Sequence, residues 1–76
     1  MFKKSSKLIV VIEGMSCDHC AHTVATSLSQ IENITKVKVN LSKKEALISY
    51  TNLPSTTLIK ETITSLGYKV LDIKNN

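Results

Sequence analysis

The side chains with the most reactive chemistry are Cys17 and Cys20, the only two cysteines, in the segment Gly14-Met15-Ser16-Cys17-Asp18-His19-Cys20. This segment separates a short β-branched run from a stretch with apolar residues at helical spacing. We therefore expect both cysteines on a loop that enters the first turn of a helix. There, unpaired backbone N–H groups and the positive end of the helix dipole favour a thiolate over a thiol. Two thiolates on one short loop can converge on a soft ion of low coordination number such as Cu(I).

Two other chemistries are open to a Cys-x-x-Cys pair. A structural zinc ion normally has four protein ligands, and this sequence has no second cysteine pair. His19 and His22 would complete a Cys₂His₂ set, but His22 lies about 200° around the helix from Cys20. A thioredoxin-like redox pair is the other alternative, for which a chain of 76 residues is short. The haem signature Cys-x-x-Cys-His is absent because Ala21 follows the second cysteine.

The apolar pattern along the chain predicts alternating strands and helices. The expected elements are a strand over 7–13, a helix over 18–31 or 18–32, strands over 36–41 and 45–51, a helix over 56–66 and a strand over 68–73. Asn33 tolerates the left-handed conformation that commonly ends a helix, and Gly67 ends the second helix. The order is β-α-β-β-α-β, the ferredoxin-like arrangement of the α+β class: a four-stranded antiparallel sheet with two helices on one face. We expect a single domain over residues 1–76, with its core at about 7–73.

Two faces of these elements bear on function. Alternation along the first strand leaves Ile9 and Val11 on the face opposite to the core, which is unusual for a sheet with one solvated face. This pair reflects either β-propensity alone or a weak self-association face.

On the first helix, the apolar stripe holds Cys20 at the edge of the core, and Cys17 on the loop is expected to be more exposed. We expect Cys17 to meet a partner first and Cys20 to follow.

The charge of the chain comes from ten lysines and no arginine, with a formal net charge of +4. Proteins that bind nucleic acids usually use arginine side chains and aromatic residues, and this chain has only three aromatics. We interpret the basic charge as favouring solubility and encounters with acidic protein partners, and we expect no direct nucleic-acid binding. Two cysteines also do not make the disulfide framework of a secreted mini-domain.

The N-terminus begins Met1-Phe2-Lys3-Lys4, which resembles the charged start of a signal peptide. The apolar run that follows has only five residues before Glu13 ends it, whereas a signal peptide needs about 7–15. No stretch approaches the roughly 20 apolar residues that span a bilayer. We therefore expect a cytoplasmic protein without membrane insertion.

The segment Gly14–Cys20, together with Gly67-Tyr68 before the last strand, resembles the signature of the heavy-metal-associated domain family. Within that family it is similar to the free-standing bacterial copper chaperones. The similarity covers about residues 7–73, nearly the whole chain. One difference is Asn33-Ile34, where the family often has Gly-Val, and Asn can adopt the same backbone conformation.

The resemblance implies a role for five side chains. Cys17 and Cys20 would be the Cu(I) ligands, Met15 a buried anchor under the loop, and Tyr68 a neighbour of the site. His19 precedes the second cysteine as in the bacterial copper chaperones, and both a solvated position and a supporting or third-ligand role are open to it.

The implied function is that of a cytosolic copper chaperone, not an enzyme. It would hand Cu(I) by ligand exchange to the metal-binding domains of a copper-transporting P-type ATPase and, in some bacteria, to a copper-responsive repressor. We expect a monomer without metal, and a copper-bridged dimer is open to the loaded form. The alternatives are a metal-binding module of a larger transporter, a carrier of mercury, zinc or cadmium, or a thiol-disulfide redox protein. Ser16 stands where zinc or cadmium versions often have a carboxylate.

Overall fold

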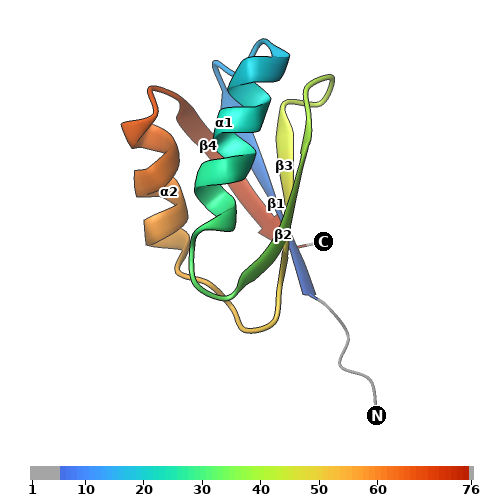
Figure 1. Cartoon of the computed structure of the whole chain (residues 1–76), viewed down its shortest axis with the longest axis vertical. Helices are drawn as coiled ribbons and strands as arrows, with labels where there is room; N and C mark the ends of the chain where they lie inside the picture. Colours follow the sequence, from blue (N-terminus) through green and yellow to red (C-terminus); the bar gives the residue numbers. More distant parts are fainter. Residues whose placement is uncertain (1–5, 76) are drawn as a thin grey trace.

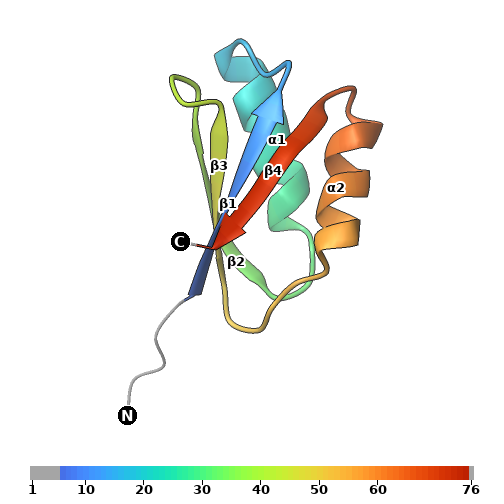
Figure 2. The ribbon, with the colours of Figure 1, turned by 180° about the vertical axis from the view of Figure 1, so that it is seen from behind.

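Four antiparallel strands in the order β2-β3-β1-β4 form a sheet that carries both helices on one face (Figure 1). This computed structural model describes residues 6–75, and its elements are β1 (Ser6–Glu13), α1 (Asp18–Ser29), β2 (Ile34–Asn40), β3 (Glu45–Tyr50), α2 (Thr56–Ser65) and β4 (Lys69–Asn75). The view from behind shows the other face of the sheet, with neither helix over it (Figure 2). The predicted ferredoxin-like βαββαβ fold is confirmed. The N-terminal segment Met1–Lys4 lies outside the described residues.

The connection from α1 to β2 is tighter than the sequence predicts. The helix ends at Ser29 and not at residue 31 or 32, because the N–H groups of Gln30 and Ile31 bond to carbonyls only three residues back. Asn33 has φ 78, in the left-handed region as expected, and β2 already starts at Ile34. Burial of both isoleucines explains this geometry, since each is 9% exposed and packs on the core.

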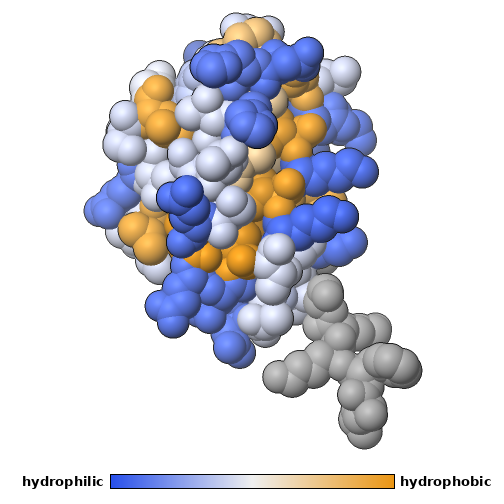
Figure 3. Space-filling model, viewed as in Figure 1, coloured by the Kyte–Doolittle hydropathy of each residue, from blue (hydrophilic) through white to orange (hydrophobic). Residues whose placement is uncertain are grey.

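The core between sheet and helices consists of apolar side chains. Its fully buried members are Val10, Ile12, Val24, Leu28, Ala46, Ile48, Ile59 and Ile63. Val37 and Val39 of β2 are half-buried, with exposed lysines between and beside them. On the helical side of the molecule, a series of hydrophilic side chains projects where β2 and β3 lie (Figure 3). Neither helix within residues 6–75 is long and apolar enough to cross a membrane.

Three loops meet at one end of the sheet (Figure 1). They join β1 to α1, β2 to β3, and α2 to β4. A hydrogen bond of 2.9 Å from the backbone N–H of Ile12 to the carbonyl of Lys44 ties the end of β1 to the second loop. In the third loop, Gly67 has φ 97, a conformation that favours glycine and that ends α2 as predicted. Both cysteines lie at this end of the molecule.

Candidate metal centre

Cys17 is the N-cap residue of α1, and Cys20 lies in the first turn of that helix. The Cys17 backbone is extended, with φ −145 and ψ 166, and its Sγ accepts a hydrogen bond of 3.4 Å from the backbone N–H of Cys20. A helix N-cap is usually Ser, Thr, Asp or Asn, whose oxygen accepts from a free N–H of the first turn. Here a sulfur takes that place, where the helix terminus favours negative charge. The placement agrees with the position predicted from the sequence.

The two sulfur atoms face one another. The Sγ atoms of Cys17 and Cys20 are 3.1 Å apart, with the Cys17 thiol donating to the Cys20 sulfur, and both are free cysteines. Cys17 is exposed, whereas Cys20 is half-buried against the core. The expected difference in exposure between the two cysteines is therefore confirmed. One ion approaching from solvent can reach both sulfurs, and it meets the sulfur of Cys17 in the more open position.

Tyr68 acts on the electrostatics of this pair from the loop before β4. Hydrogen bonding from its hydroxyl is the main reason why the pKa of Cys20 falls from 9.0 to about 7. The Cys17 thiol and the backbone at Ser16 lower this pKa further. In return, the Cys20 sulfur raises the pKa of Tyr68, since it stabilises the protonated hydroxyl. The lowered pKa favours the Cys20 thiolate, the form that binds a soft metal.

Packing holds Tyr68 and the cysteine loop together. The Tyr68 ring is half-buried, and its backbone N–H donates to the carbonyl of Ile63 over 3.2 Å. A Cβ at Gly14 would lie 3.3 Å from Cδ1 of the Tyr68 ring, so only glycine permits this approach without movement. Gly14 also has φ +102, which favours glycine. In the sequence Gly14 stands out only as part of the motif, and nothing in the residue pattern predicts its contact with the tyrosine.

Met15 is 1% exposed and belongs to the core, as the resemblance implied. It anchors the loop between Gly14 and Ser16, both of which are exposed. The buried thioether therefore fixes the start of the cysteine loop without itself being open to solvent.

Neither histidine joins the cysteines in a larger donor cluster. His19 and His22 are both exposed on α1, and the carbonyl of His19 accepts a bond of 3.0 Å from the Thr23 hydroxyl. Across residues 6–75, no group of three or more His, Cys, Asp or Glu side chains is arranged to hold a metal ion. In this part of the chain, the donor atoms that lie together are the two sulfurs, and the structure does not bring the histidines beside them as a Cys₂His₂ set.

Several known proteins are similar to this chain in sequence and fold. The family model for the heavy-metal-associated domain matches residues 9–69. The copper chaperone CopZ of Staphylococcus haemolyticus (strain JCSC1435) is 36% identical over 63 residues, which cover 82% of this chain and 93% of that protein. A solved CopZ metallochaperone has 32% identity and a TM-score of 0.78, covering 87% of this chain and 100% of the other. The N-terminal domain of a potential copper-translocating P-type ATPase from Bacillus subtilis, solved in its Cu(I)-loaded state, has 30% identity and a TM-score of 0.78, covering 95% of this chain and 88% of that one.

Proposed function

The chain belongs to the heavy-metal-associated domain family, and from this membership we propose that it is a copper chaperone that carries one Cu(I) ion between Cys17 and Cys20. The observation that carries the proposal is the pair of free sulfurs, 3.1 Å apart on one loop, with the first exposed and the second half-buried. Soft thiolates suit Cu(I), and a site with two donors leaves the ion coordinatively unsaturated. In this proposal the protein carries the Cu(I) ion in the cytoplasm and does not act as an enzyme.

Binding requires the sulfurs to move apart. With a metal–sulfur bond of about 2.3 Å, the length known for zinc, two sulfurs on opposite sides of an ion lie about 4.6 Å apart. The present separation of 3.1 Å therefore widens on loading. Cys17 has the freedom to make this movement because it is exposed at the helix N-cap, whereas Cys20 packs against the core. The Tyr68 hydroxyl lowers the pKa of Cys20 and so favours its thiolate, the form that binds the ion.

Transfer proceeds by ligand exchange without a free ion. A thiolate of the partner adds to the ion as a third sulfur, the bond to exposed Cys17 breaks, and the bond to Cys20 breaks when a second partner thiolate has bound. Copper stays monovalent, so no electrons move, and the protons released by the partner thiols return to the thiolates left behind. Tyr68 stabilises the Cys20 thiolate at the moment it is released.

The partner is the metal-binding domain of a copper-transporting P-type ATPase. This is supported by the similarity between this chain and such a domain from Bacillus subtilis, since the two share a fold and can present matching loops. Exposed Lys43 and Lys44 lie in the loop next to the cysteine loop, so an acidic surface on the partner speeds the encounter, and salt weakens this effect. A copper-responsive repressor is a second recipient of the ion. Sulfurs from two chains that share one ion give a copper-bridged dimer.

Two alternative functions have specific support. A pair of thiolates also suits mercury, zinc or cadmium, as a carrier or as a module of a larger transporter. Facing sulfurs with one pKa near 7 also suit thiol-disulfide exchange. The reduction potential of the pair and an insulin-reduction assay separate the redox function from metal transport.

Anaerobic titration of the reduced chain with Cu(I), Zn(II) and Hg(II) tests the function. Metal counts and the native mass of each loaded species are measured together, in competition with a chelator. We expect one Cu(I) per chain and transfer of that ion to an isolated ATPase domain without release to the chelator. Zinc binding that outcompetes Cu(I), or insulin reduction at the rate of a thioredoxin, would overturn the proposal.

A further inference from the structure

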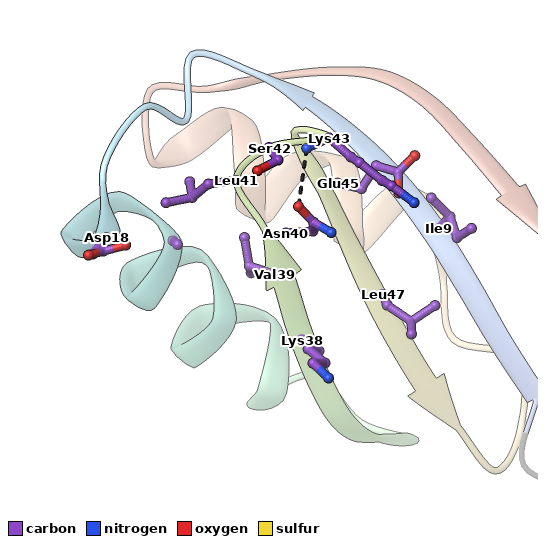
Figure 4. Close-up of a pocket in the computed structure, with 11 residues that line it drawn as sticks. Ile9, Asp18, Lys38, Val39, Asn40, Leu41, Ser42, Lys43, Glu45 and Leu47 are labelled. Atoms are coloured by element: carbon purple, nitrogen blue, oxygen red, sulfur yellow. Dashed lines mark hydrogen bonds between the residues drawn. The ribbon is translucent and has the colours of Figure 1, made fainter.

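The face of the sheet opposite to the helices has an apolar centre. Ile9, Val11 and Leu47 point to this face, because their neighbours along β1 and β3 are the buried core residues. Ile9 and Leu47 are directly paired in the sheet, and all three side chains are half-buried. Figure 4 shows Ile9 and Leu47 lying away from α1, whereas Val39 and Leu41 project toward it. Neither helix covers this centre (Figure 2).

Charged side chains of opposite sign flank this apolar centre along the strand direction. Four lysines of this face lie beside Ile9 in the neighbouring strands or nearer to the start of β1: Lys7, Lys36, Lys38 and Lys74. Beyond Ile9, at the levels of Val11 and of the end of β1, the same face carries Glu13, Glu45 and Asp72. Lys69 also lies at the acidic end, opposite Glu13. The face therefore has a cationic half and a largely acidic half.

We propose that a second copy of this chain packs on this open face, with the strands of the two sheets running in opposite directions. A two-fold axis that passes between Ile9 and Val11 sets Ile9 of one copy against Val11 of the other. It also sets Lys7 against Glu13, so the cationic half of each copy meets the acidic half of its partner. A partner with a single sign of charge would match only one half of the face and oppose the other half.

The size of the face predicts weak association. Four strands about 4.8 Å apart and seven residues of about 3.3 Å each cover roughly 400 Å² in projection, about half of the ~800 Å² per partner in a standard interface. The dimer is therefore populated at high concentration, and the chain is mostly monomeric when dilute. The antiparallel arrangement places the two cysteine loops at opposite ends, because each loop follows the end of β1. This dimer forms without metal and leaves both sulfur pairs open.

Sedimentation equilibrium of the reduced, chelator-treated full chain from micromolar to millimolar concentration tests this inference. We expect the average mass to rise from monomer toward dimer, equally in the wild type and in the Cys17→Ser/Cys20→Ser variant. Ile9→Lys, which puts a charge in the apolar centre, lowers the association constant by about tenfold or more. A chain that stays monomeric at millimolar concentration, or a dimer that requires the cysteines, would overturn the proposal.

Reversing the charges of surface residues tests how the two copies are oriented, and it leaves the apolar centre of the face unchanged. Lys7→Glu weakens association by about fivefold, because the new carboxylate faces Glu13 of the second copy. The double variant Lys7→Glu/Glu13→Lys restores association, since the pattern is again self-complementary. Lys60→Glu on α2 makes the same change of net charge away from the open face and leaves association unchanged. An effect of Lys60→Glu equal to that of Lys7→Glu, or a double variant that is weaker still, contradicts this arrangement.

Discussion

The aromatic ring of Tyr68 lies so close to Gly14 that a Cβ on the glycine would be 3.3 Å from Cδ1 of the ring. This contact joins the loop before α1 to the loop before β4, which are more than fifty positions apart in the sequence. It holds the Tyr68 hydroxyl where it lowers the pKa of Cys20. The reactivity of the second cysteine thus depends on a glycine six positions before it in the chain.

Gly14→Ala is expected to lower the free energy of unfolding by about 2–3 kcal/mol, since it combines a strained φ with a crowded Cβ. Gly67→Ala is the matched control, because its φ of +97 is similar but no atom lies within 4 Å of the added Cβ. We expect the control to lose only about 1–2 kcal/mol from backbone strain. Urea unfolding of both variants measures the difference, and equal losses would show that the Tyr68 contact contributes nothing.

Tyr68→Phe is expected to raise the pKa of Cys20, because the hydroxyl is the largest cause of its fall from 9.0 to about 7. The thiolate is the reactive form, so alkylation of Cys20 by iodoacetamide at pH 7 slows severalfold. Peptide mass spectrometry across a pH series locates the modified sulfur and gives the midpoint. Tyr50→Phe, a half-buried tyrosine on β3, serves as the control and leaves this midpoint in place.

The same shift has a signature in stability. The folded chain holds Cys20 as a thiolate at a lower pH than the unfolded chain does, so the unfolded state binds more protons between about pH 7 and pH 9.0. The free energy of unfolding therefore rises with pH across this window. The contribution is complete above pH 9.0 and is lost as the pH falls through about 7. Tyr68→Phe is expected to flatten this rise, and an unchanged slope would contradict the role given to the hydroxyl.

Cys17→Ser and Cys20→Ser, singly and together, are expected to abolish stoichiometric Cu(I) binding, because a serine hydroxyl is a poor ligand for a soft ion. Competition with a chelator under anaerobic conditions measures the loss. His22→Ala, an exposed change on the same helix, is the control and keeps one Cu(I) per chain. His19→Ala tests the remaining histidine: normal stoichiometry with faster transfer assigns it a supporting role, whereas lost binding makes it a ligand.

Met15→Ala is expected to lower the free energy of unfolding by about 2–4 kcal/mol, since the side chain is 1% exposed and its removal leaves a cavity under the cysteine loop. Leu53→Ala removes an apolar side chain that is 65% exposed and should change stability by about 0.5 kcal/mol or less. Thermal unfolding of the two variants provides the comparison. A Met15→Ala variant as stable as Leu53→Ala would mean that the loop does not need its anchor.

Local patterns in the sequence were sufficient for the order of strands and helices and for the position of the cysteines. Alternation of apolar residues, Gly67 at the end of α2 and the left-handed residue Asn33 each act within a few positions, so their effects can be predicted from neighbours alone. The end of α1 was predicted two or three residues too late, because burial of Ile31 and Ile34 against the sheet favours an early turn. Helical spacing alone carries no information about that sheet.

The tertiary structure decided how the site is tuned. Tyr68 meets Cys20 only because α2 and β4 bring the last loop of the chain back to the first, and Gly14 leaves room for its ring. Alternation along the first strand predicted Ile9 and Val11 on the open face, but only strand pairing adds Leu47 beside them and divides the charged residues into two halves. Types and spacing of residues determine which groups are available, and packing between distant segments determines their environment.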